Sequence, residues 1–461
     1  MRPLQQAEVL VIGAGIMGSG IAQVAAQAGH RVLLHDSRDG AAAHAKDKLA
    51  VTFQSLVAKG RQTPEQAAAT LARIVPTDAL QDAATAGLVV EAIVEELGAK
   101  RSLMQRLEGI VVADCVLATN TSSISVTAIA NGLQHPGRLV GMHFFNPVPL
   151  MKLVEVVSGL HTDPALAQAV FDLALAWGKL PVHARSTPGF IVNRIARPYY
   201  AEALALLLQQ AATPPVLDAC LRGAGFRMGP CELMDLIGHD TNFAVTQSVY
   251  DANFQDKRYA PSLVQREMVD GGLLGRKSGR GFYRYPEGTG RLPVAVPHVD
   301  GAAASDWVTG AREVTVHGEG AIADHLEAAA AHALAGQGFG PARLQGSGWT
   351  GLVIDGAQLV MSTGRTAGEL ALQRRRSDVA VFDRIAVLPA ASGTALAYSV
   401  APDASPAFHA QAAAWLSALG FAPQAAADTP GLVVARTIAM LINEAADAVQ
   451  QGVCEDRKSV V

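Results

Sequence analysis

A glycine-rich turn between two short apolar runs constrains the fold of this chain more than any other feature. The apolar run at 8–12 (EVLVI) leads directly into 13–18 (GAGIMG), and helix-forming residues follow. A second apolar run (VLLHD) then closes on Asp36. Strand, GxGxxG, helix, strand and acid form the complete dinucleotide-binding fingerprint, in which the helix N-terminus faces the pyrophosphate. We therefore predict a Rossmann-type α/β domain at the start of the chain.

The residues of this turn have separate tasks. Gly13 allows the tight turn, Gly15 lets the backbone approach the pyrophosphate, and Gly18 lets the helix pack closely on the strand. Asp36 stands where a carboxylate accepts the ribose hydroxyls and repels the extra phosphate of NADP, so the predicted cofactor is NAD. The predicted cofactor contacts of the loop are Gly13, Gly15, Ile16, Met17 and Gly18.

A histidine and an acid stand near opposite ends of the apolar segment 141–157, GMHFFNPVPLMKLVEVV. Its two prolines forbid a continuous helix, so the segment is predicted to form strand, turn and strand. Such a hairpin can bring His143 beside Glu155. A carboxylate fixes the imidazole tautomer and raises its basicity, which suits a general base near neutral pH. A buried histidine satisfied by a structural acid is the alternative.

Several segments together resemble the L-3-hydroxyacyl-CoA dehydrogenase family over residues 9–285. They are VIGAGIMGSGIA, VVEAIVEE, TNTSSI, GMHFFNPVPLMKLVEVV, TPGFIVNR and GLLGRKSGRGFY. The resemblance implies NAD-dependent oxidation of a (3S)-3-hydroxyacyl-CoA to the 3-oxoacyl-CoA. It implies that His143 takes the hydroxyl proton while hydride leaves for the nicotinamide. Glu155 would orient His143 and stabilise its cationic form.

The same resemblance implies roles for polar residues around this pair. Ser122 and Asn193 would bind the reacting oxygen or hold the substrate, and Asn120 would contact the nicotinamide end. Glu95 and Lys100 would line the cofactor site. From the residues alone, Ser122 also fits a helix N-cap, and Asn193 fits a polar position on a helix face.

Composition narrows the class of protein. A length of 461 residues predicts two or three domains, and a net charge of -4 leaves no electrostatic footprint for nucleic acid or an anionic membrane. Neither a membrane-spanning apolar run nor a secretory signal is expected. The cysteines lack metal-ligand spacing, so we expect no metal site and reduced thiols in a cytoplasmic protein. They are Cys115, Cys220, Cys231 and Cys454.

The predicted domains are an NAD-binding domain at 1–186, a helical domain at 187–286, a reduced α/β unit at 302–428 and a partial second helical repeat at 429–461. Strands are expected in the first domain at 9–12, 32–35, 88–90, 116–118, 139–143 and 153–157. Further strands are expected at 314–316, 352–354 and 385–388. Residues 190–210 are predicted to be helical, with a kink or break at Pro198. A second GxGxxG match at 346–351 lacks the strand and helix around it and is predicted to be a loop.

The second helical repeat is visible as an echo of TPGFIVNR (187–194) in TPGLVVAR (429–436). Glu202 and Gln209 recur at the same offset as Glu444 and Gln451. Asn193 is replaced by Ala435, so the second copy is predicted to be catalytically silent. Its single helix must pack on the first copy, unless the chain is truncated. In the family this chain resembles, the helical domain makes dimer contacts, so we predict a homodimer or higher homo-oligomer. A contact between the two copies within one chain could take the place of such a contact between subunits.

The acyl group is left open by the sequence. Residues up to 285 resemble short 3-hydroxybutyryl-CoA dehydrogenases, whereas the added units resemble the long bacterial 3-hydroxyadipyl-CoA dehydrogenases of phenylacetate degradation. A terminal carboxylate suits an arginine, and the candidates are Arg194, Arg197 and Arg227, each of which also fits an ordinary ion partner. Lys59 is a candidate for a CoA phosphate.

Two other functions compete with this one. β-Hydroxyacid dehydrogenases also join a Rossmann domain to a helical one, but they use a catalytic lysine, which the paired His143 and Glu155 argue against. A scaffold subunit of a β-oxidation assembly would not need to keep Ser122, His143, Glu155 and Asn193 together.

Overall fold

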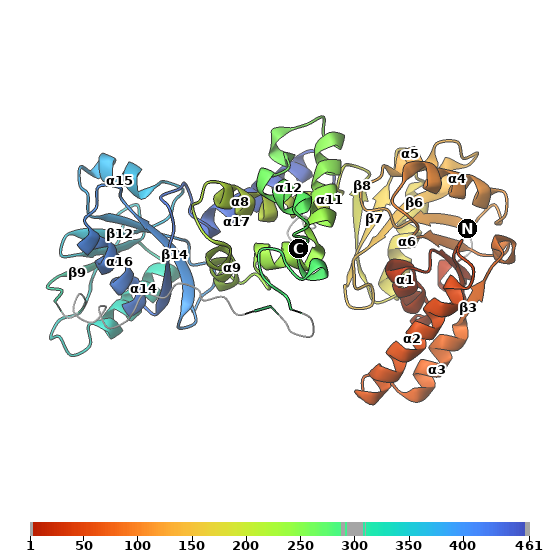
Figure 1. Cartoon of the computed structure of the whole chain (residues 1–461), viewed down its shortest axis with the longest axis horizontal. Helices are drawn as coiled ribbons and strands as arrows, with labels where there is room; N and C mark the ends of the chain where they lie inside the picture. Colours follow the sequence, from red (N-terminus) through yellow and green to blue (C-terminus); the bar gives the residue numbers. More distant parts are fainter. Residues whose placement is uncertain (1–2, 287–290, 293–307, 309, 457–461) are drawn as a thin grey trace. The chain divides into compact units, whose positions relative to one another are not determined.

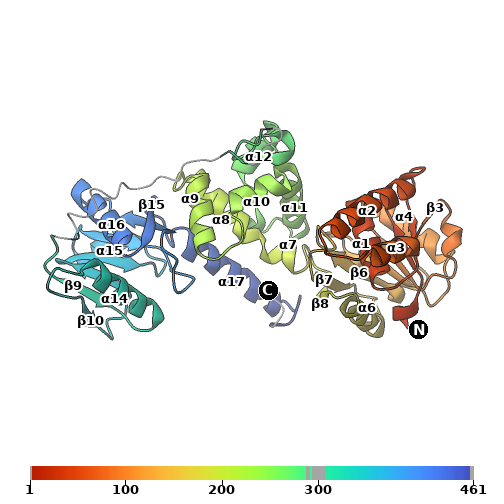
Figure 2. The same ribbon diagram turned by 90° about the horizontal axis from the view of Figure 1, so that it is seen from below.

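The structure is a computed structural model that describes residues 3–286, 291–292, 308 and 310–456. It divides into two compact units (Figures 1 and 2). The first unit comprises residues 1–195 together with 445–461, and the second comprises residues 196–444. No helix among the described residues is both long and apolar enough to span a lipid bilayer.

The first unit contains an eight-stranded sheet of order β3-β2-β1-β4-β5-β6-β7-β8, in which only the β6–β7 pair is antiparallel. The strands are β1 (Val9–Ile12), β2 (Val32–His35), β3 (Ile74–Thr77), β4 (Leu88–Glu91), β5 (Val116–Thr119), β6 (Leu139–Phe144), β7 (Leu153–Ser158) and β8 (Leu180–Arg185). The six predicted strands are confirmed, four of them ending one residue later than predicted. The sequence analysis missed β3 and β8, which carry Pro76 and Pro181. Both lie at sheet edges, where proline is tolerated.

Helices cover both faces of this sheet. Successive β1 residues alternate between two cores: Val9 and Val11 pack with residues of α1 and α6, whereas Leu10 and Ile12 pack with residues of α4 and α5. Figure 1 shows these helices around the sheet. Burial on both faces explains why β1 is apolar throughout. The helices are α1 (Ile16–Gln27), α2 (Ala41–Ala58), α3 (Pro64–Arg73), α4 (Leu97–Glu108), α5 (Val126–Ala130), α6 (Pro164–Ala176) and α7 (Val192–Ile195).

A helical region begins the second unit. The predicted break near Pro198 is confirmed, because α7 ends at Ile195 and α8 begins at Arg197, with the proline in its first turn. The helices are α8 (Arg197–Leu208), α9 (Pro214–Gly223), α10 (Pro230–Ile237), α11 (His239–Ala252) and α12 (Leu263–Asp270). The closing segment GLLGRKSGRGFY is structural: buried Asp235 accepts the N–H of Phe282, and a Cβ at Gly281 would lie 2.0 Å from the Asp235 Oδ1 atom.

The reduced α/β unit forms a seven-stranded sheet of order β10-β9-β11-β12-β13-β14-β15. Its strands are β9 (Val314–His317), β10 (Ala342–Leu344), β11 (Gly351–Ile354), β12 (Ala357–Met361), β13 (Val379–Phe382), β14 (Thr394–Val400) and β15 (Phe421–Ala425). Its helices are α14 (Ala321–Ala333), α15 (Ala367–Arg374) and α16 (Pro406–Ala418). The strands predicted at 314–316 and 352–354 are confirmed. The loop predicted at 346–351 is confirmed for residues 346–350, but Gly351 begins β11. The expectation that no strand precedes this GxGxxG match is wrong, because β10 ends at Leu344. The strand predicted at 385–388 is wrong: Ile385 is buried in the core, but this run lies in the loop after β13.

The helix of the second repeat, α17 (Val434–Gln450), packs on the first copy. Arg194 donates to Asp447 at 2.6 Å and to Gln451 at 3.0 Å. Arg436, the counterpart of Arg194, donates to Glu202 and to Gln209, the counterpart of Gln451. The arginine of each repeat therefore contacts the glutamine of the other repeat, as expected for two antiparallel segments.

Candidate active site

The antiparallel pairing of β6 with β7 sets His143 directly opposite Glu155. The His143 Nδ1 atom lies 2.5 Å from the Glu155 Oε2 atom, and both side chains are buried, at 5% and 0% exposure. An ionised Glu155 accepts the Nδ1 proton, which leaves Nε2 as the basic nitrogen. The rings of Phe145 and Phe190 lie 4.5 and 5.8 Å from the imidazole and give it apolar walls.

The other oxygen of Glu155 holds the start of α7. Its Oε1 atom accepts the backbone N–H groups of Ile191 and Val192, both at 2.9 Å. The next residue, Asn193, donates from Nδ2 to the carbonyl of Ser122 at 3.4 Å. One carboxylate therefore fixes both the imidazole and the helix that carries Asn193, and this helix meets the loop after β5.

That loop is organised by Glu95, whose Oε1 atom accepts the Thr121 hydroxyl at 2.7 Å and the Ser122 N–H at 2.8 Å. Burial alone would raise the pKa of Glu95, but the charge of Lys100 and these hydrogen bonds outweigh it, and the pKa is lowered. The N-cap interpretation of Ser122 is wrong, because α5 begins later and Ser125 caps it. Ser122 therefore keeps its hydroxyl at the loop surface, in contact with Glu95.

Lys100 lies beneath the loop rather than on it. Its side chain is 1% exposed, and its ammonium contacts Glu91 at 2.6 Å and Glu95 at 3.2 Å. Asn120 has a similar bracing contact, because its Oδ1 atom accepts the N–H of Phe144 at 2.9 Å. Both residues thus set the geometry of the β5 loop next to the strand that carries His143.

The glycine loop borders a cavity of about 550 Å³. A Cβ at Gly13 would lie 2.4 Å from the Ala92 oxygen, and one at Gly18 would lie 1.7 Å from the Gly13 oxygen, so both positions require glycine. A Cβ at Gly15 would meet no atom within 4 Å, so the space in front of this residue is open for a pyrophosphate. Ile16 is 78% exposed beside it. The residues present fit a dinucleotide.

Asp36 lines the same cavity and is held from two sides. Its Oδ2 atom accepts the N–H of Ala14 at 2.8 Å, and its Oδ1 atom accepts the Arg38 Nε–H at 2.9 Å. The hydrogen bond from Arg38 is the main cause that lowers the pKa of Asp36 to about 2. The carboxylate predicted to bind ribose is therefore ionised, and an exposed guanidinium covers it.

The turn between His143 and Glu155 is clamped by Lys179, which the sequence analysis missed. The buried ammonium donates to the carbonyls of Val148 at 2.5 Å and Met151 at 2.9 Å. Val148 also packs against α1, where a Cβ at Gly20 would lie 2.8 Å from the Val148 Cβ atom. The hairpin that carries His143 thus packs on helix α1, which follows the glycine loop. A lysine beside a strand start ordinarily indicates an exposed position, so the sequence carried no signal for this role.

A second groove, of about 380 Å³, continues from the glycine loop along α2 and is lined by Ser19, Lys48 and Thr52 among others. Lys59 is exposed at the end of α2, on the face that also carries Lys48 and Thr52, because positions 48, 52 and 59 repeat at helical spacing. The two lysines on this face suit phosphate groups, whereas the Thr52 hydroxyl donates to the Lys48 carbonyl at 3.0 Å.

Comparison with known proteins accounts for all three parts of the fold. Residues 8–187 match "3-hydroxyacyl-CoA dehydrogenase, NAD binding domain", and residues 189–285 match "3-hydroxyacyl-CoA dehydrogenase, C-terminal domain". Residues 359–430 match "3-hydroxybutyryl-CoA dehydrogenase reduced Rossmann-fold domain". The predicted order along the chain, with a Rossmann domain first, a helical domain second and a reduced α/β unit third, is confirmed.

Individual relatives agree. The chain is 43% identical over 450 residues to the 3-hydroxyadipyl-CoA dehydrogenase of Escherichia coli K12, which covers 97% of this chain and 86% of that protein. It is 44% identical over 278 residues to a probable 3-hydroxybutyryl-CoA dehydrogenase of Deinococcus radiodurans, which covers 60% of this chain and 99% of that protein. A crystal structure of 3-hydroxybutyryl-CoA dehydrogenase from Escherichia coli K12 matches 98% of this chain and 87% of that chain, with 40% identity and a TM-score of 0.83. The chain therefore belongs to the 3-hydroxyacyl-CoA dehydrogenase family of NAD-dependent enzymes.

Proposed function

We propose that the chain oxidises 3-hydroxyadipyl-CoA to 3-oxoadipyl-CoA, with His143 as general base. The observation that carries this proposal is the buried His143–Glu155 pair, because it leaves Nε2 as the one basic nitrogen of an imidazole held in a fixed tautomer. When bound, NAD accepts the hydride from C3 of the substrate.

The protein's own groups perform the remaining steps. The His143 Nε2 atom takes the proton of the 3-hydroxyl, and Glu155 stabilises the imidazolium that forms. Ser122 and Asn193, which contact each other at the mouth of the β5 loop, would hydrogen-bond the oxygen as it gains carbonyl character. The phenyl rings around the imidazole exclude water, which strengthens these interactions.

The groove along α2 is proposed to bind the phosphates of CoA. Lys48 and Thr52 line it, and Lys59 lies further along the same face. Because these side chains are solvent-accessible, each contact would contribute modestly and its effect would fall with salt.

The adipyl substrate is supported by similarity along nearly the whole chain to the Escherichia coli 3-hydroxyadipyl-CoA dehydrogenase. The relatives named for 3-hydroxybutyryl-CoA include two proteins that match 60% and 61% of the chain and one crystal structure that matches 98% of it, so that substrate is the alternative. A role in phenylacetate catabolism follows if the adipyl substrate is correct. A homodimer or higher homo-oligomer and a cytoplasmic location are part of the proposal, the latter supported by four free cysteines.

The test is NADH formation, followed by absorbance, with 3-hydroxyadipyl-CoA and 3-hydroxybutyryl-CoA side by side. Wild type is expected to prefer the adipyl substrate, and His143→Ala is expected to lower kcat by at least about 100-fold. A preference for the four-carbon substrate would overturn the adipyl assignment. Full activity in His143→Ala would overturn the assignment of the base.

A further inference from the structure

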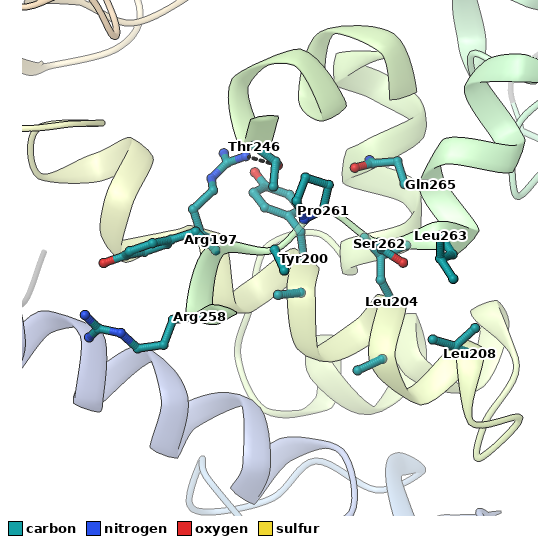
Figure 3. Close-up of a pocket in the computed structure, with 14 residues that line it drawn as sticks. Arg197, Tyr200, Leu204, Leu208, Thr246, Arg258, Pro261, Ser262, Leu263 and Gln265 are labelled. Carbon is teal, nitrogen blue, oxygen red and sulfur yellow. Dashed lines mark hydrogen bonds between the residues drawn. The ribbon is translucent and has the colours of Figure 1, made fainter. Parts of the chain in front are cut away.

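The cavities of the two units present different charges. The cavity of about 240 Å³ in the second unit is lined mainly by apolar side chains, and its charged side chains are arginines (Figure 3). One of them, Arg197, donates to the Thr246 hydroxyl at 3.1 Å. In the first unit, residues 92–94 line the cavity beside the glycine loop, and Glu95 follows them directly. A negative charge therefore stands next to the segment that lines the predicted cofactor site.

Glu95 is one of three charged side chains that meet at the end of β4. The Lys100 ammonium lies 2.6 Å from Glu91 and 3.2 Å from Glu95. Glu91 and Lys100 are both buried and form the closer pair, and the other Glu91 oxygen accepts the Thr119 hydroxyl at 2.7 Å. Within the part of the chain that the structure describes, these three side chains form no further ion pair. Two carboxylates and one ammonium leave one negative charge in excess.

This excess charge lies mainly on Glu95, because its side chain is the accessible member of the group. It is 38% exposed, whereas Glu91 is fully buried and closer to Lys100. Its Oε1 atom accepts the N–H groups of Ser122 at 2.8 Å and Ser123 at 3.2 Å, and its Oε2 atom faces Lys100. Burial alone would raise the pKa of Glu95, but the pKa is lowered, so this carboxylate is ionised at neutral pH.

The strand order places Glu95 on the path from the glycine loop to His143. The strands β1, β4, β5 and β6 are parallel neighbours in this order, so they end at the same edge of the sheet. The glycine loop follows β1, Glu95 follows β4, and Ser122 follows β5. Strands about 4.8 Å apart put β1 and β6 roughly 14 Å from each other. A dinucleotide with its pyrophosphate at the glycine loop must cross the ends of β4 and β5 to reach the carbon beside His143.

The two redox forms of this cofactor differ in charge at their reacting end. The nicotinamide ring is positively charged when oxidised and neutral when reduced. Oxidation of the substrate sends hydride from C3 to the ring and the hydroxyl proton to the His143 Nε2 atom. One positive charge therefore leaves the ring and appears on the imidazole, where Glu155 faces it. A fixed carboxylate near the ring attracts the oxidised form alone.

We propose that Glu95 discriminates between NAD⁺ and NADH by its charge, strengthening the binding of the oxidised form relative to the reduced form. The proposal rests on the role of His143 in the proposed function, which locates the reacting end of the cofactor. It makes Glu95 a residue that eases the release of NADH, in addition to holding the loop after β5. Because more than a third of the side chain is exposed, screening by solvent limits the effect.

The experiment measures Kd for NAD⁺ and for NADH by isothermal titration calorimetry, on the full chain and without substrate. Each variant is first checked for folding by circular dichroism. Glu95→Gln should lower the ratio of Kd for NADH to Kd for NAD⁺ about 3- to 10-fold, because the amide keeps the shape and loses the charge. Glu95→Asp keeps the charge and should keep most of this ratio. The control Glu96→Gln removes a neighbouring charge that caps α4 and should match wild type.

A second control separates charge from loop geometry. Thr121→Val removes a hydrogen bond of 2.7 Å to Glu95 and leaves its charge, so any loss of affinity should be the same for NAD⁺ and NADH. A wild-type ratio in Glu95→Gln would overturn the proposal. The same change of ratio in Thr121→Val as in Glu95→Gln would also overturn it.

Wild type itself provides a test that does not depend on the folding of Glu95→Gln. Between about 0.05 and 0.5 M salt, its ratio of Kd for NADH to Kd for NAD⁺ should fall, because salt screens the carboxylate. A constant ratio would overturn the proposal. Since no substrate is present, none of these results depends on which acyl-CoA the enzyme prefers or on the activity of His143→Ala, so failure of this proposal is distinguishable from failure of the proposed function.

Discussion

Asp383 caps helix α17 in the way that Glu155 caps helix α7. Asp383 accepts the backbone N–H groups of Val433 at 2.9 Å and Val434 at 2.6 Å. These residues occupy the positions in the second repeat that Ile191 and Val192 occupy in the first, where Glu155 is the acceptor. Both units therefore bury a carboxylate at the start of the repeated helix.

The two acids reach this place from different strands. Glu155 lies on β7, opposite His143 on β6. Asp383 directly follows β13, and its N–H donates to Ala397 on the antiparallel partner β14 at 2.9 Å. Asp383 thus stands in the position of His143, and Ala397 in that of Glu155. The second unit therefore has a carboxylate that caps the repeated helix but no histidine at the position of His143.

This comparison predicts different results for two amide substitutions. Glu155→Gln keeps an oxygen for the helix but removes the charge beside His143, so kcat should fall by about 100-fold or more. Asp383→Asn makes the same change in the second unit and should leave kcat within about twofold while changing the melting temperature. Steady-state kinetics and thermal melting on both variants provide the check. Equal losses of kcat would contradict the separate roles.

Arg38 is predicted to weaken the discrimination between NAD and NADP. Its guanidinium forms an ion pair with Asp36, the carboxylate that we predict to repel a 2′-phosphate. In Arg38→Ala the preference for NAD over NADP, measured as a ratio of kcat/KM, should therefore rise by about tenfold. Arg31→Ala removes an exposed arginine paired with Glu8 and serves as the control. An unchanged ratio in Arg38→Ala would refute this role.

Asp36 should also make part of the stability depend on pH. Its pKa is lowered from 3.8 to about 2, so its contribution is present above pH 3.8 and is lost as the pH falls through about 2. The free energy of unfolding, measured in urea at pH 5 and at pH 3, should decrease less in Asp36→Asn than in wild type. A decrease of the same size in both proteins would show that the ionised carboxylate does not stabilise the fold.

Lys179 is predicted to position the hairpin that carries His143. Lys179→Met removes the donor that holds the Val148 and Met151 carbonyls, so kcat should fall by about tenfold, with NAD affinity less affected. Lys152→Met changes an exposed lysine of the same turn and should match wild type. Kinetics and NAD titration by fluorescence distinguish the two variants. A wild-type kcat in Lys179→Met would contradict the clamp.

The contacts of α17 make oligomeric state testable. If the second repeat replaces a contact between subunits, deleting residues beyond 285 should expose the α8 surface that Arg436 covers and increase association. Measuring the solution mass of the full-length and shortened chains compares their oligomeric states. The same degree of dimerisation in both chains would count against an internal replacement.

Local patterns explain why much of this site could be predicted from the sequence. His143 and Glu155 are joined by a short hairpin, and the glycine loop lies within one strand–helix unit. The geometry of each motif could therefore be predicted from residues that are close in the sequence. Contacts between distant segments carried no such pattern. Ile191 and Val192 donate their N–H groups to Glu155, but α6 and β8 separate them from Glu155 in the sequence. Strand β13 was missed because its short apolar run follows a charged segment.

The matching contacts of Arg194 with Gln451 and of Arg436 with Gln209 have an evolutionary consequence. In a symmetric homodimer one mutation alters both faces of the interface at once. Here each copy of the repeat is encoded separately, so selection can act on one without touching the other. The asparagine at 193 and the alanine at 435 are one such difference: a polar side chain is present in one copy and absent from the other.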